Sequence, residues 1–184
     1  MEDAASSKTK VLAEIIVFSA LSAVLYVIRP FSLPYGGSVT LGSMVPVAWL
    51  SLRRGVYAGV IAGAIFGILA LFIDVLLLPY SPIANPMQVF LEYPLAFGVI
   101  GLTGLFHRKS SIFIMTGFAI SVFLRFLLHA IAGYIFWAYI YEFPSEWGVL
   151  WPLVYNGSFL LVEFIISAIL IFVLVKKGTL NFAL

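Results

Sequence analysis

Residues 53–78 read RRGVYAGVIAGAIFGILALFIDVLLL, an apolar stretch with a pair of arginines at its start. At about 1.5 Å per helical residue, this stretch is long enough to cross a hydrocarbon core about 30 Å thick. Glycine recurs at every fourth position, and such spacing lets a second helix approach closely inside a membrane. The glycines are Gly55, Gly59, Gly63 and Gly67. The stretch therefore predicts a membrane-spanning helix with one face suited to close packing.

The composition of the whole chain indicates the same class of protein. Its 184 residues are 63% hydrophobic and 10% charged, and the mean hydropathy is +1.14. A domain surrounded by water needs far more surface charge, so we expect a single integral membrane domain over residues 1–184. The chain has no cysteine, which excludes disulfides, and its net charge of +2 is too small to indicate nucleic-acid binding.

Apolar segments along the chain predict an all-α membrane protein, a bundle of six transmembrane helices. The segments cover residues 11–28, 39–52, 56–78, 86–106, 111–139 and 149–175. The second is short for a full crossing, which indicates that it is tilted, broken or partly interfacial. The polar segment 1–10 and the apolar run after it lack a small-residue cleavage site, so we interpret that run as a retained span and not a signal peptide.

The basic residues favour one orientation of this bundle. In a six-span arrangement, one side of the membrane receives Lys8, Lys10, Arg53, Arg54, Arg108, Lys109, Lys176 and Lys177. The other side receives Arg29 and the acids Glu142 and Glu146. Positively charged loops remain in the cytoplasm, so both termini of this multi-pass membrane protein are expected there.

Small residues predict where helices meet. We expect the glycines of 55–67 to pack inside the bundle and not to form a homodimer interface. A facing surface is available at Gly98, Gly101 and Gly104. The first span carries a second small-residue patch, which could face another subunit and comprises Ser19, Ala20 and Ala23.

Glu92 is the most informative polar residue, because an ionised carboxylate near hydrocarbon needs a cation close by. Counting about 1.5 Å per residue puts Glu92 and Asn156 about 9 and 12 Å below the outer surface. Arg125 and His129 reach the same outer part of the membrane from another span. The simplest structural interpretation is an ion pair between Glu92 and Arg125. The functional one is a site for an organic cation, with Arg125 holding Glu92 ionised until the ligand arrives.

Aromatic and small residues surround this predicted site. Arg125, His129, Gly133 and Trp137 recur every four residues and share one broad helical stripe. Trp151, Tyr155 and Asn156 begin the last span. Taken singly, His129 is a packing residue and Trp137 a residue of the interfacial belt; taken together, the set favours a ligand site. Asp74 is expected to lie close to water.

Several classes of function find no support in the sequence. There is no GxxxxGK[ST] for ATP binding, no HExxH or other metal-ligand spacing, and no GxSxG nucleophile, so an enzyme is not expected. A self-contained ion-coupled transporter is the main alternative, with Asp74, Glu92 and Glu163 as coupling acids. No repeat of two related halves supports that alternative. A third possibility is a membrane scaffold that binds partners through its glycines.

Four short pieces carry a resemblance to a known family. They are Ser51-Leu-Arg-Arg-Gly55, Leu91-Glu92-Tyr93, His129-Ala-Ile-Ala-Gly133-Tyr-Ile-Phe-Trp137 and Asn156-Gly157. In this order and spacing the chain resembles the thiamine-specific substrate-binding S components of energy-coupling factor (ECF) vitamin transporters. The resemblance implies six spans, cytoplasmic termini and a thiamine pocket near the outer face.

The resemblance also implies roles for particular residues. Glu92 would neutralise the thiazolium cation, and His129 and Trp137 would form aromatic walls. Tyr93 would add ring and hydroxyl contacts, and Trp151 would stack on a thiamine ring. Asn156 would hydrogen-bond the aminopyrimidine, Arg125 matches a basic position near the glutamate, and Gly133 lets the ligand lie close. The first outer loop differs from some relatives, which have a tryptophan lid near Gly37, and here Tyr35 is the candidate lid residue.

The partners implied by the resemblance are a transmembrane coupling subunit and two cytoplasmic ATPase subunits. ATP would be used only by those subunits, and this chain would need no cofactor or metal of its own. Relatives dock through alanines of the first span, but Ile16 stands where the first alanine falls, which leaves Ser19, Ala20 and Ala23 as the docking candidates. No cluster of cations suited to a pyrophosphate is evident, so we expect unphosphorylated thiamine as the ligand.

Overall fold

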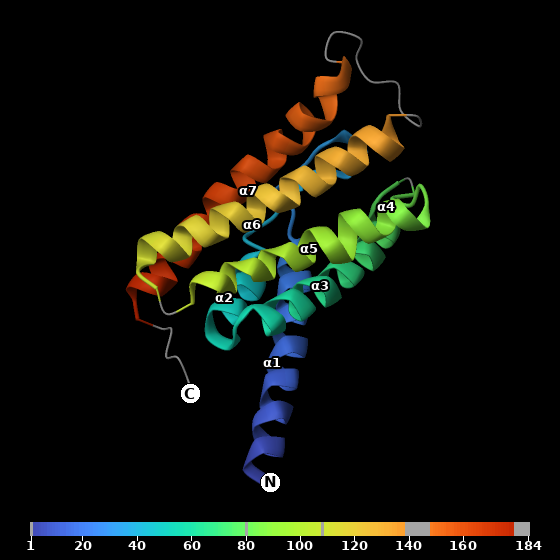
Figure 1. Ribbon diagram of the computed structural model, residues 1–184. Helices are drawn as coiled ribbons and strands as arrows, with labels where there is room; N and C mark the ends of the chain where they lie inside the picture. Colours follow the sequence, from blue (N-terminus) through green and yellow to red (C-terminus); the bar gives the residue numbers. More distant parts are fainter. Residues whose placement is uncertain (1, 80, 108, 139–147, 179–184) are drawn as a thin grey trace.

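The computed structural model describes residues 2–79, 81–107, 109–138 and 148–178, and is predominantly helical (Figure 1). Five helical stretches in these residues are long and apolar enough to cross a membrane. They are Lys8–Val27 within α1 (Glu2–Val27), α3 (Val56–Leu77), Pro86–Phe106, Ser111–Trp137 and α7 (Trp151–Lys176). A short helix, η5 (Gly148–Leu150), leads into α7. The predicted membrane helices are confirmed at these positions.

The second predicted span differs from the others. Helix α2 (Val45–Arg54) has ten residues, so it is about 15 Å long and cannot cross the membrane alone. Before it lie a hairpin of β1 (Phe31–Ser32) and β2 (Ser38–Val39), joined by η1 (Pro34–Gly36), and then a non-helical stretch. The strands are antiparallel, with Phe31 opposite Val39. The segment 39–52 is therefore broken, and a sixth membrane-spanning helix is not observed in the described residues.

Two of the long helices contain a wider π-type turn. The helix Pro86–Phe106 consists of α4 (Pro86–Phe90), the π turn η2 (Leu91–Leu95), α5 (Ala96–Gly98) and the 3₁₀ segment η3 (Val99–Phe106). Pro94 lies inside η2 and has no N–H to donate, which disturbs the regular hydrogen-bond ladder. Helix α6 (Ser111–Ala132) continues into a second π turn, η4 (Gly133–Trp137). Such turns are frequent at functional sites.

Glycines allow α3 to pack directly on the helix Pro86–Phe106, which confirms the prediction of internal packing. A Cβ at Gly63 would overlap the carbonyl oxygen of Phe97, and one at Gly67 would overlap that of Tyr93. Gly101 packs in the same way against the backbone of α3. Gly55 has a different role: with φ of +88° it forms the turn between α2 and α3, a conformation that favours glycine.

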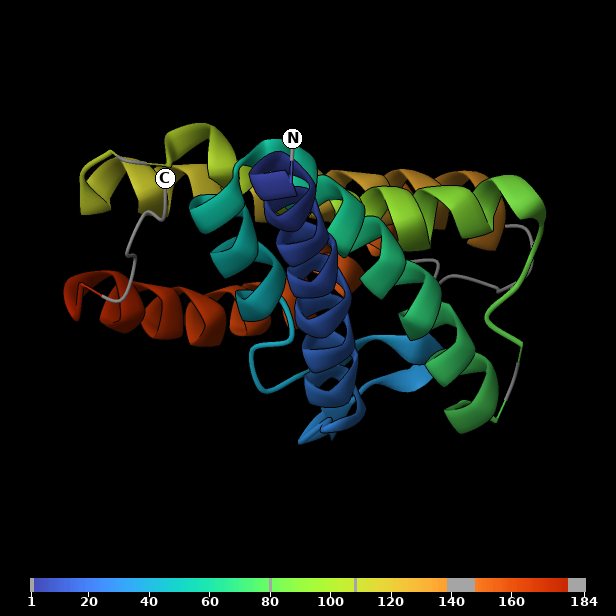
Figure 2. The ribbon, with the colours of Figure 1, turned by 90° about the horizontal axis from the view of Figure 1, so that it is seen from below.

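Helix α1 lies along α2 and α3, in front of the rest of the bundle in Figure 2. The Ser19 hydroxyl donates to the Ala62 carbonyl on α3 (2.9 Å), and both Ser19 and Ala23 are buried. These two residues therefore do not form an exposed docking patch, because both are buried within the protein itself. Of the three predicted docking residues only Ala20 is exposed, and it shares that face with Ile16.

We predict that Gly63→Ala destabilises the protein by about 1–3 kcal/mol, because the added methyl group overpacks the contact with Phe97. Thermal unfolding in detergent measures the effect. Gly98→Ala is the matched control on the facing helix, since a Cβ there would have its nearest neighbour at 3.6 Å, an ordinary contact. Equal unfolding midpoints for the two variants would contradict the packing described above.

Candidate functional site

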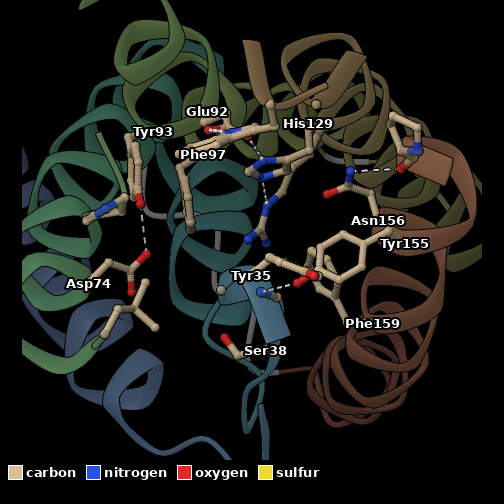
Figure 3. A pocket seen from close by; sticks show the side chains of 18 of the residues that line it. Tyr35, Ser38, Asp74, Glu92, Tyr93, Phe97, His129, Tyr155, Asn156 and Phe159 are labelled. Atoms are coloured by element: carbon tan, nitrogen blue, oxygen red, sulfur yellow. Dashed lines mark hydrogen bonds and ion pairs between the residues drawn. The ribbon is translucent and has the colours of Figure 1, made fainter. Parts of the chain in front are cut away.

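A cavity of about 230 Å³ lies between the hairpin, η2, the C-terminal part of α6 with η4, and the start of α7 (Figure 3). It brings together every residue that the sequence predicted for a ligand site. The lining includes Glu92, Tyr93, Arg125, His129, Gly133, Trp137, Trp151 and Asn156, with the predicted lid residues Tyr35 and Gly37. Segments far apart in the sequence thus converge on one cavity.

Glu92 lies on the π turn η2 and is held by neutral donors. The Trp137 indole Nε1–H lies 3.1 Å from Oε1 and 3.0 Å from Oε2 of the carboxylate. The Gln88 side-chain amide also donates to Oε2. Nδ1 of His129 lies 3.9 Å from Oε1. These contacts orient the carboxylate, but neither Trp137 nor Gln88 cancels its charge.

The other acids whose side chains are described each meet an arginine. Asp74 pairs with Arg29 at 2.5 Å, and Glu14 pairs with Arg54 at 2.7 Å. Glu163, on α7, lies 3.5 Å from Nη1 of Arg125. Within the described residues, Glu92 forms no ion pair with an arginine or lysine. A half-buried carboxylate without such a partner is suited to a cationic ligand.

The ion pair between Glu92 and Arg125, which was the alternative to a ligand site, is not observed. Arg125 turns instead toward Glu163, which does not line the cavity and is 1% exposed. Its Nε–H is 3.5 Å from Nε2 of His129, and its guanidinium carbon lies 4.2 Å above the Phe97 ring. Helical spacing had correctly placed Arg125 and His129 on the cavity face, but it could not show which acid Arg125 meets.

Asn156 and Gly133 define one wall of the cavity. The Asn156 side-chain amide donates to the Pro152 carbonyl at 2.8 Å. Its side-chain oxygen points toward the middle of the cavity in Figure 3, where it can accept a hydrogen bond. A Cβ at Gly133 would lie 3.1 Å from Pro152 Cβ, so a larger residue would press on this wall. Trp151, one turn before Tyr155, adds a ring to the same side.

Hydrogen bonds from Tyr155 hold the hairpin against the cavity. The Gly37 N–H donates to the Tyr155 hydroxyl at 2.8 Å, and this hydroxyl donates in turn to the Pro34 carbonyl. The Tyr35 ring stands edge-on to the Tyr155 ring with centroids 6.2 Å apart. A Cβ at Gly37 would come within 2.7 Å of the Phe159 ring, so glycine lets the hairpin approach α7. The lid candidates are thus at the cavity, as predicted.

Sequence reasoning missed part of the lining. Asp74 was expected near water, but it is 4% exposed. It accepts hydrogen bonds from the hydroxyls of Tyr26 (3.0 Å) and Tyr93 (2.9 Å) as well as from Arg29. The Tyr93 hydroxyl therefore contacts Asp74. Tyr26, Phe97 and the other additional lining rings carry no sequence signal, since aromatic residues are common in any apolar helix.

The cavity combines the Glu92 carboxylate, several aromatic rings and an amide acceptor, while Asp74 and Arg125 in its lining are each held in an ion pair. Ring faces and a carboxylate both attract positive charge, most strongly where water is excluded. The amide oxygen adds a directional contact for a polar edge of the ligand. The arrangement is suited to a flat, cationic heteroaromatic molecule.

Comparison with known proteins gives consistent matches. A family model described as "Thiamine transporter protein" matches residues 12–182. The chain is 32% identical over 144 residues to the thiamine transporter ThiT of Lacticaseibacillus paracasei, covering 71% of this chain and 70% of the relative. It is 30% identical over 176 residues to the ThiT of Bacillus subtilis, covering 87% of each.

Two solved structures share the fold. One is ThiT from Listeria monocytogenes, with a TM-score of 0.79 and 27% identity over 95% of this chain and 98% of that chain. The other is described as the S component of a bacterial ECF transporter, with a TM-score of 0.60 and 22% identity over the same shares of the two chains. The second likeness concerns the fold alone.

We predict that Tyr155→Phe loosens the hairpin, because it removes both hydrogen bonds made by the hydroxyl. Losing about 1 kcal/mol of local stability speeds amide exchange about fivefold. Hydrogen–deuterium exchange of peptides spanning residues 31–39 measures this change. Tyr57→Phe is the matched control, on a side chain of α3 that is 80% exposed. Unchanged exchange in the Tyr155 variant would show that its hydroxyl does not hold the hairpin.

Proposed function

Because this chain belongs to the thiamine transporter family, we propose that the cavity beside Glu92 is its thiamine-binding site. The protein is a multi-pass bacterial membrane protein that serves thiamine uptake, which is a transport function and not an enzymatic one. The observation that carries the proposal is the state of Glu92, a carboxylate oriented by Trp137 and Gln88 with no arginine or lysine paired to it in the described residues.

In this proposal Glu92 is the counter-ion of the thiazolium ring, whose positive charge is fixed. The faces of Trp137 and His129 enclose that ring, and desolvated cation–π contacts contribute about 2 kcal/mol each. Trp151 and the Tyr93 ring enclose the remainder of the ligand.

The free side-chain oxygen of Asn156 accepts from the exocyclic amine of the aminopyrimidine, and Gly133 leaves room for that ring. Tyr35 and Gly37 close the cavity from the hairpin.

The charges around the cavity favour thiamine without phosphate groups. Two arginines lie at the cavity or next to it, and each is paired: Arg125 with Glu163, and Arg29 with Asp74. Neither guanidinium is available to a pyrophosphate without breaking an ion pair in the interior. An added phosphate would also bring negative charge close to Glu92.

We further propose six crossings with both termini in the cytoplasm. We assign the second crossing to residues 38–54, in which β2, the irregular residues 40–44 with their bends and turns, and the ten-residue α2 follow one another. Residues 37–52 are buried except Leu41, and irregular backbone at membrane depth is tolerated when protein surrounds it. Most of the basic residues fit this orientation, while Arg108, Glu142 and Glu146 lie outside the described residues.

The energy for uptake is proposed to come from partner subunits. The chain has no phosphate-binding loop, so a coupling subunit and two ATPase subunits would supply ATP hydrolysis, and this chain would need no cofactor. The fold shared with an S component supports that role. The exposed face around Ala20 is the remaining docking candidate on α1. An ion-coupled mechanism is not favoured, since two of its three acids, Asp74 and Glu163, are paired with arginines.

We predict that Glu92→Gln weakens thiamine binding about tenfold or more, a loss of at least about 1.4 kcal/mol, because the amide keeps the shape but not the charge. Quenching of tryptophan fluorescence by thiamine, titrated on purified protein, measures the affinity. Glu14→Gln is the matched control, since Glu14 pairs with Arg54 and does not line the cavity. Equal affinities in wild type and the Glu92 variant would exclude Glu92 from the site.

We predict that Asn156→Ala reduces the discrimination between thiamine and its 4′-oxo analogue. Wild-type protein favours thiamine because the side-chain oxygen of Asn156 accepts from an amine but faces an oxygen in the analogue. Removing this acceptor narrows the ratio of the two dissociation constants by about tenfold. Competition titrations with both compounds measure the ratio, and an unchanged ratio would place the aminopyrimidine elsewhere.

A further inference from the structure

Glu163 is a buried acid that neither lines the cavity nor has a role in the proposed contacts. Its carboxylate is 1% exposed and lies behind Arg125 as seen from the cavity. The Thr40 hydroxyl donates to Oε1, and the Ser43 hydroxyl lies 3.0 Å from the same oxygen. Oε2 is 3.5 Å from Nη1 of Arg125. Glu163 is therefore oriented by the stretch between β2 and α2 and directed at Arg125 from α7.

Arg125 stands between two carboxylates. On one side Nη1 faces Glu163, and on the other Nε lies 3.5 Å from Nε2 of His129. The opposite nitrogen of the same His129 ring lies 3.9 Å from Glu92. One imidazole ring thus separates this guanidinium, which is always charged, from the carboxylate proposed to bind the ligand cation.

This arrangement creates a competition. Attraction between charges is strong where water is excluded, so an Arg125 without a counter-ion would be drawn to the Glu92 carboxylate. It would then neutralise the charge that the thiazolium needs. Glu163 removes the competition by giving Arg125 a carboxylate of its own, on the side away from the cavity.

We propose that Glu163 is a positioning residue for the cation site: it holds Arg125 away from Glu92 and so keeps the Glu92 carboxylate available to a positively charged ligand. The inference rests on the proposed function, because it presumes that Glu92 binds the thiazolium. The inference predicts that Glu163 affects the binding of a cationic ligand more than that of a neutral ligand of the same shape. A merely structural role of Glu163 would affect both ligands alike.

The test is the affinity of Glu163→Gln for two probes, thiamine and its neutral thiophene analogue, in which carbon replaces the thiazolium nitrogen. We expect the dissociation constant of thiamine to rise about tenfold or more, and that of the neutral analogue to change by less than about twofold. Loss of shape or stability would weaken both probes alike. Equal weakening of the two probes, or no weakening of either, would overturn the inference.

The double variant Glu163→Gln/Arg125→Gln gives an independent result, since replacing both members of an ion pair avoids a buried unpaired charge. Without the competing guanidinium, thiamine affinity should rise again relative to Glu163→Gln. A double variant as weak for thiamine as the single variant would contradict the competition. If Glu163→Gln alone does not fold, the double variant is compared with wild type instead. A double variant that binds thiamine more weakly than wild type, but binds the neutral analogue equally well, would again contradict the proposal.

Thr40→Val is the matched control within the same cluster. It removes a hydroxyl that contacts Glu163 but leaves both charges in place. The ratio of the two probe affinities should therefore stay at its wild-type value, and a changed ratio would contradict a mechanism based on charge. Wild-type protein that binds the neutral analogue but not thiamine would refute the proposed function itself. If wild-type protein binds thiamine and Glu163→Gln shows no selective loss of thiamine affinity, only the inference about Glu163 is refuted.

Discussion

Neutralisation of charge in an apolar interior is the constraint on which the rest of this structure depends. Carboxylates buried near hydrocarbon need cations, and Asp74 and Glu163 each meet an arginine. Glu92 meets the indole of Trp137 and the amide of Gln88 instead. Neutral donors stabilise the carboxylate without cancelling its charge, so the cavity retains a negative charge. This imbalance suits the proposed binding of a thiazolium cation, and in our inference the neighbouring ion pair of Arg125 and Glu163 preserves it.

The same site depends on departures from regular helical structure. Glu92 and Tyr93 lie on one π turn, and Gly133 and Trp137 lie on another. The hairpin supplies the proposed lid residues, and the irregular residues after it supply the hydroxyls that contact Glu163. Backbone of this kind can exist at membrane depth because neighbouring helices surround it. Close glycine contacts hold α3 against the helix that carries Glu92, which keeps that wall of the cavity in place.

Much of the site could be predicted from one sequence because its residues are chemically unusual for their surroundings. Each polar residue within an apolar helix is a candidate on its own, here a glutamate, an arginine, a histidine and an asparagine. The position of each residue along its helix then places all four at a similar depth. All eight predicted binding residues line the cavity. The aromatic rings that complete it, such as Phe97 and Phe159, could not be distinguished from ordinary packing residues, because they continue the apolar pattern of their helices.

By itself the sequence determined the class of protein, the positions of five membrane helices and the glycine face of α3, since these follow from composition and spacing along the chain. The tertiary structure alone decided which charges meet. Arg125 reaches Glu163 and not Glu92, and Asp74 is buried under two tyrosine hydroxyls and Arg29. It also showed that residues 39–52 are broken into an irregular stretch and a short helix. The physical reason is that ion pairing depends on the rotation and approach of helices distant in sequence, which hydropathy along a single chain does not encode.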